Sequence, residues 1–259
     1  MLSKSVTGFG KGVISFFEEA GIITRLLAGI IRSLPRIPKS RRLVLYQMEH
    51  IGVNSLPLVL IIAAFTGAVA AWQAAYQLKG IAPLSFLGGA VARAIVTELA
   101  PVLTGIVIAG RVGASIAAEL GTMKVTEQID ALEIMAVNPI RFLAMPRFVA
   151  AVIMMPLISV FAIAISIVGA YVVSNYFLGV SFDVFFQSVR RYFDLYDLMA
   201  GLIKTVFFGG VTSLLGCHIG LQTEGGAEGV GKATIRSFVL SASMILILDY
   251  ALWMLLFSA

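Results

Sequence analysis

Five long apolar segments set the limits on what this chain can fold into. They cover residues 51–76, 84–108, 148–177, 198–221 and 238–257. A helix needs about 20 apolar residues to cross the hydrocarbon of a bilayer, and each segment provides them. Because lipid offers the backbone no hydrogen bonds, these segments must be helical. Charged residues make up only 13% of the chain, against about 25% in soluble domains. The sequence therefore predicts a single all-α membrane domain over residues 1–259.

The N-terminal segment, residues 1–34, has an amphipathic pattern. Charged residues recur every seven positions, at Lys4, Lys11, Glu18, Arg25 and Arg32. Apolar residues follow helical spacing on another face. The charges interrupt every window that could cross a bilayer, and the pattern is not that of a cleavable signal peptide. We expect an interfacial helix in the headgroup plane that ends before Pro35 and Pro38. A soluble amphipathic helix resting on another subunit is the alternative.

The distribution of Lys and Arg predicts the orientation. Residues 1–50, 111–147 and 222–237 hold fourteen of them, whereas the connections 77–83 and 178–197 hold three. Basic residues collect on the cytoplasmic side of membrane proteins. We therefore expect a cytoplasmic N-terminus and, after five transmembrane helices, a periplasmic C-terminus.

The connection between the second and third apolar segments is rich in charge yet periodic. Within residues 124–138, Val125, Ile129, Leu132 and Ala136 share one helical stripe, and Glu127, Asp130 and Glu133 lie away from it. This spacing predicts a short amphipathic helix that Asn138-Pro139 ends. A partner that pushed on such a helix would move both adjoining spans. An ordinary surface helix has the same pattern.

Three stretches of the sequence resemble the MlaE (YrbE) family of permeases. They are TEQIDALEIMAVNPIRFLAMPR at 126–147, VTELAPVLTGIVIAGRVGASIAAELGTM at 96–123 and GLIKTVFFGG at 201–210. The resemblance extends over nearly the whole chain. One departure is Thr97-Glu98, where many relatives have Arg-Glu, so no role can be assigned to an arginine there.

The resemblance implies a permease subunit of an ABC transporter that carries phospholipid between the two membranes of Gram-negative bacteria. It implies a multi-pass protein of the inner membrane that pairs with a second copy of itself, with ATPase subunits and with a periplasmic MCE-domain protein. Residues 124–138 would be the coupling helix, with Glu127, Asp130 and Glu133 as ATPase contacts. ATP and Mg would be bound by the ATPase, and this chain would hold no cofactor.

Four charged residues lie in or near the apolar segments: Arg93, Glu98, Lys204 and Asp249. Each costs about 2.5–3.5 kcal/mol at a helix centre, so each needs a partner, a cavity or a function. We expect Lys204 to pair with Asp249 if the fourth and fifth spans pack side by side. Glu98 is predicted either to line a lipid cavity or to pair with Arg93.

The outer end of the first span mixes apolar and polar side chains. By resemblance, this region belongs to a lipid cavity, to which we assign Trp72, Gln73, Tyr76 and Leu78 together with Glu98. An apolar wall with a few polar groups suits acyl chains and a headgroup. A belt of interfacial aromatic residues explains Trp72 and Tyr76 equally well.

Other function classes find little support. The segment GAEGVGKA at 226–233 nearly matches a phosphate-binding loop, but Ala233 replaces the required hydroxyl and a membrane span precedes it, so we expect a flexible turn. His50 and His218 fall in no metal-binding pattern, and no catalytic motif or nucleic-acid-binding pattern is present. The remaining alternatives are a permease for another hydrophobic compound, such as a sterol, and a membrane scaffold or enzyme without transport.

Overall fold

The computed structural model describes residues 2–257, and the side chains of residues 14 and 17–257. The described residues form helices and connecting turns, without a β-strand. The side chains of Lys4 and Lys11, part of the predicted amphipathic pattern, lie outside the described residues. Five helical stretches are long and apolar enough to cross a membrane: Phe17–Leu78, Leu84–Val125, Ile140–Leu178, Leu195–Leu221 and Gly226–Phe257. The chain is therefore a multi-pass membrane protein.

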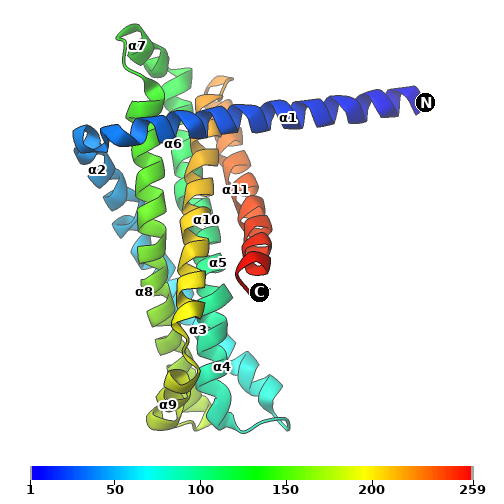
Figure 1. The fold of residues 1–259 in the computed structure, drawn as a ribbon, viewed down its shortest axis with the longest axis vertical. Coiled ribbons are helices and arrows are strands. Elements are labelled where there is room, and N and C mark those ends of the chain that lie inside the picture. Colours follow the sequence, from blue (N-terminus) through cyan, green and yellow to red (C-terminus); the bar gives the residue numbers. More distant parts are fainter. Residues whose placement is uncertain (1, 258–259) are drawn as a thin grey trace.

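The bundle consists of helices that run alongside one another (Figure 1). They are α3 (Leu56–Leu78), α4 (Leu87–Ala94), α5 (Ala100–Ile108), α6 (Ala114–Val125), α8 (Met145–Leu178), α10 (Leu195–Leu221) and α11 (Gly226–Phe257). Helix α1 (Leu2–Ser33) crosses one end of the bundle at a steep angle and extends beyond it (Figure 1). The α7 helix (Gln128–Ile134) lies at this same end, and α9 (Phe182–Tyr192) lies at the other.

The second span is one long helical path with two irregular turns. Helices α4, α5 and α6 are joined by π-helical turns at Ile95–Leu99 and Ala109–Gly113. Such wide turns are rare and occur frequently at functional sites. The first one contains Glu98 and is followed, after Ala100, by Pro101, which cannot donate a backbone hydrogen bond to the preceding turn. The path continues to Val125, and so includes the stretch up to Leu120 over which the sequence allows the predicted segment 84–108 to continue as helix.

Several helix ends differ from the predictions. The first span begins at Leu56, because residues Arg41–Ile51 form a separate helix, α2. The predicted turn at 226–233 is wrong, since these residues form the first two turns of α11. The predicted helix over 124–138 is too long: α7 covers only Gln128–Ile134, and Glu127 and Ala136 on either side have positive φ angles of 61° and 57°. By contrast, α1 ends at Ser33, before the prolines, as predicted.

Small residues let the spans approach closely. A Cβ atom at Gly67 of α3 would lie 1.8 Å from the carbonyl oxygen of Ser166 on α8, and 2.5 Å from its carbonyl carbon. Nearby, the Ser166 hydroxyl donates a hydrogen bond to the Ala63 carbonyl at 2.9 Å. Small residues at such crossings are the usual means of tight helix packing in membranes.

We expect Gly67→Ala to separate α3 from α8 and to lower the midpoint temperature of unfolding in detergent. The obstacle is backbone, which cannot rotate away, so an overpacking cost of about 1–3 kcal/mol applies. Gly231→Ala in α11 is the matched control, because its Cβ atom would meet nothing within 4 Å. Equal midpoints for the two variants would show that this crossing is not tight.

Candidate functional site

Three charged side chains from three different spans meet inside the bundle. The Lys204 ammonium on α10 lies 2.5 Å from Glu98 Oε1 in the first π-helical turn and 2.9 Å from Asp249 Oδ1 on α11. The Lys204 side chain is 0% exposed, while both carboxylates are partly exposed. The predicted Lys204–Asp249 pair is thus present, and Glu98 is a second carboxylate partner of Lys204. We call these three residues the Lys204 cluster.

The Lys204 cluster joins the second, fourth and fifth spans at one point. Helix packing alone would hold these spans by apolar contacts, which are weak determinants of register in lipid. A buried ammonium between two carboxylates fixes the relative positions of the three spans, because separating the spans would leave unpaired charges in a medium of low dielectric. The cluster is therefore suited to keeping three spans in one arrangement, or to switching between arrangements together.

Arg93 does not pair with Glu98. Its Nε lies 2.8 Å from Asp197 Oδ2, at the first turn of α10. The Arg93 side chain is 65% exposed, whereas that of Asp197 is 5% exposed. Sequence reasoning overlooked Asp197, because it sits at the edge of an outer connection where a solvated carboxylate is the ordinary expectation. The second span and α10 are thus linked by two ion pairs.

The predicted lipid-cavity residues separate into two places. Trp72 and Tyr76 line an open groove of about 490 Å³ at the α9 end of the bundle, together with Lys79, Leu84 and Leu178. The Trp72 ring also meets Phe177 edge to face, with centroids 6.0 Å apart. Gln73 and Leu78 are not among the lining residues of this groove, and Glu98 belongs to the Lys204 cluster. The groove walls are mostly apolar, and Lys79 is the one charged residue among those that line it.

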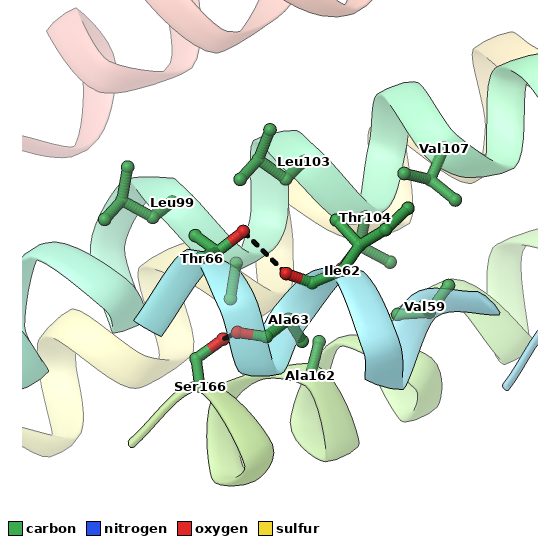
Figure 2. Close-up of a pocket in the computed structure, with 11 residues that line it drawn as sticks. Val59, Ile62, Ala63, Thr66, Leu99, Leu103, Thr104, Val107, Ala162 and Ser166 are labelled. Carbon is green, nitrogen blue, oxygen red and sulfur yellow. Dashed lines mark hydrogen bonds between the residues drawn. The ribbon is translucent and has the colours of Figure 1, made fainter. Parts of the chain in front are cut away.

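A second, much smaller cavity lies between α3, α5 and α8 (Figure 2). Its free space of about 10 Å³ suits about one water molecule and no acyl chain. Of the three hydroxyl-bearing residues drawn there, Thr66 and Ser166 donate to the backbone carbonyls of Ile62 and Ala63 at 2.8 and 2.9 Å, and Thr104 is the third (Figure 2). This cavity is a packing feature of the spans and not a site for lipid.

The connection around α7 presents an apolar tip. Ile129 is buried against the bundle, and the Lys124 ammonium holds the Asp130 carboxylate at 2.7 Å. Four residues after Asp130, Ile134 is 87% exposed, and its neighbour Met135 is also well exposed. Glu127 and Glu133 are also exposed, so of the three predicted contact residues Asp130 alone has an internal partner among the described residues. Two large apolar side chains at the tip of a charged connection are typical of a protein contact.

Comparison with known proteins identifies the family. The sequence profile described as "Permease MlaE" matches residues 44–255. The chain is 36% identical over 260 residues to the intermembrane phospholipid transport system permease protein MlaE of Haemophilus influenzae, covering 100% of both chains. The chain belongs to the MlaE permease family. It is also 38% identical to a "Probable ABC transporter permease protein" of Rickettsia typhi, over 96% of each chain.

The chain is also similar to a plant protein. The Arabidopsis thaliana chloroplast protein trigalactosyldiacylglycerol 1 is 33% identical over 94% of this chain and 70% of its own length. The bacterial relatives are ABC transporter permeases, which are transporter components rather than enzymes, and an ABC permease requires an ATPase partner. The described residues contain no group of three or more His, Cys, Asp or Glu side chains suited to hold a metal ion.

Proposed function

We propose that this protein is the transmembrane subunit of an ABC transporter that moves phospholipid between the inner and outer membranes of a Gram-negative bacterium. The full-length similarity to a named phospholipid permease carries this proposal. The energy comes from a separate ATPase that binds ATP and Mg. The chain works as a pair of copies below a periplasmic MCE-domain protein, and lipid is held between the two permeases.

The orientation in the inner membrane follows from charge. The end of the bundle with α1 and α7 carries the connections rich in Lys and Arg, so it faces the cytoplasm. Helix α1, nearly crosswise to the spans, then lies in the cytoplasmic headgroup plane (Figure 1). The groove at Trp72 and Tyr76 opens at the periplasmic end, and the C-terminus lies on the periplasmic side.

In this arrangement, the α7 connection receives the mechanical work. The apolar tip, Ile134 and Met135, inserts into the ATPase, and Glu127 and Glu133 contact its rim. Because α7 follows α6 directly, its displacement moves the second span, and the Lys204 cluster passes that movement to α10 and α11. The three spans then shift together and change the shape of the lipid site.

Purification of the intact assembly tests the proposal. We expect the tagged chain to bring down an ATPase and an MCE-domain protein, and lipid extraction followed by mass spectrometry to yield phospholipid. Recovery of a sterol-like compound would assign a different substrate class. Recovery of the chain without an ATPase or lipid would contradict transport and favour a scaffold.

We expect Ala82→Trp to lower the amount of phospholipid bound to the purified assembly by roughly tenfold. Ala82 lines the groove at Trp72 and is half-buried, so an indole there occupies the space of an acyl chain. An overpacking cost of about 1–3 kcal/mol corresponds to a loss of this order. Ala90→Trp, at an exposed position of α4, is the control that should retain the lipid. Full occupancy in Ala82→Trp would place the lipid elsewhere.

A further inference from the structure

A second apolar groove lies under α1, at the opposite end of the bundle from Trp72. Its volume is about 330 Å³, within the range of small-molecule sites of about 300–1,000 Å³. Its apolar walls come from α1, α10 and α11, through Ile23, Leu215, Leu240 and Met244. Its polar end is formed by Glu19 and His218. We call it the α1 groove.

The polar end of the α1 groove holds an unsatisfied buried nitrogen. The His218 side chain is 2% exposed, and its Nε2 lies 3.5 Å from Glu19 Oε1 without forming a hydrogen bond to any described residue. The Glu19 carboxylate is instead bound by the Arg236 guanidinium of α11. A buried polar atom left without a partner costs about 1–3 kcal/mol, and a ligand that supplies one recovers this.

The charges around the polar end decide what kind of ligand fits. Glu19 and Arg236 neutralise each other, and the imidazole adds an uncharged polar group. A free anion or cation would find no net counter-charge there. A neutral hydrogen-bonding group attached to an apolar tail satisfies both parts of the groove.

We propose that the α1 groove binds one phospholipid of the cytoplasmic leaflet, with an acyl chain along α11 and an ester carbonyl at His218 Nε2. The position of the groove along the membrane normal agrees with a phospholipid ligand. Helix α1 lies in the headgroup plane in the proposed orientation, and the ester groups of a bilayer lie just beneath the headgroups. This inference rests on the orientation given under the proposed function. The groove is a lipid site separate from that at Trp72, and the bound lipid fills the wedge between α1 and α11.

Site-specific photo-crosslinking tests this inference in the assembled transporter. The photoreactive residue p-benzoyl-phenylalanine replaces Leu240, which lines the groove, or Leu246, which is exposed on the same helix and is not among its lining residues. Both proteins are extracted from the membrane in detergent, separated from free lipid by gel filtration and then irradiated. Intact-mass measurement identifies what has been attached.

We expect a phospholipid adduct at position 240 and no lipid adduct at position 246, because only a bound lipid survives extraction. His218→Leu should reduce the adduct at 240 by about fivefold, the value of one neutral hydrogen bond. Attachment of a second copy of the chain or of another subunit at 240 would overturn the inference, as would equal lipid adducts at both positions. Transport by the assembly is a separate measurement, so an empty α1 groove would leave the proposed function standing.

Discussion

Lys204→Met is expected to destabilise the folded chain by about 3–5 kcal/mol, since it leaves two carboxylates inside the bundle without a counter-charge. The Lys204 ammonium is fully buried and lies within 3 Å of both Glu98 and Asp249. Methionine has a similar length and is apolar, so the change removes charge with little loss of volume. The measurement is the midpoint temperature of unfolding of the purified chain in detergent.

Two comparisons separate the charge effect from a packing defect. The triple change Glu98→Gln, Lys204→Met, Asp249→Asn removes all three charges and should recover most of the lost stability. Lys232→Met breaks the Glu228–Lys232 pair of α11, in which both side chains are mostly exposed and which is worth only about 0–1 kcal/mol. A Lys204→Met midpoint no lower than that of Lys232→Met would show that the Lys204 cluster does not hold the spans.

Ile134→Asp is expected to abolish copurification of the ATPase while leaving the chain inserted in the membrane. The Ile134 side chain is almost fully exposed at the end of α7, so its replacement costs the isolated chain little. Burying an isoleucine at an interface contributes about 1.5–3 kcal/mol, and a buried unpaired carboxylate adds a further penalty. Together these effects lower affinity by roughly 100-fold or more.

The control for the coupling contact is the neighbouring carboxylate. Glu133→Ala removes a charge at the rim, where side chains contribute little to affinity, so most of the ATPase should remain bound. A complex of normal composition with Ile134→Asp would refute the apolar tip as the docking element. The reverse ranking, with Glu133→Ala the more harmful, would restore the charged residues as the main contacts.

The sequence predicted the features that depend on long patterns. Five spans and the extent of α1 follow from hydropathy and periodicity over many residues, and the structure contains helices for both. The Lys204–Asp249 pair also followed from the cost of isolated charges in lipid. Features that depend on a single backbone angle could not be predicted in this way. The short α7 ends at Ile134, because Ala136, an ordinary helix former, takes a positive φ angle.

Contacts between segments that are distant in the sequence could not be predicted either. The π-helical turn at Ile95–Leu99 has no clear sequence signature apart from the proline that follows it, so the partner of Glu98 was left open between a cavity and Arg93. The pairing of Arg93 with Asp197, and of Glu19 with Arg236, joins residues of opposite charge from segments that the sequence alone does not bring together. In both cases the relative placement of helices was needed.

The most direct test of the account is lipid transfer by the reconstituted transporter. The purified assembly is placed in vesicles that contain a fluorescent phospholipid, with acceptor vesicles and ATP outside. We predict that fluorescent phospholipid redistributes only when ATP is hydrolysed, and that the Ile134→Asp chain fails to support this transfer. Transfer at the same rate without ATP, or no phospholipid transfer by an assembly that hydrolyses ATP, would contradict a phospholipid permease driven by a separate ATPase.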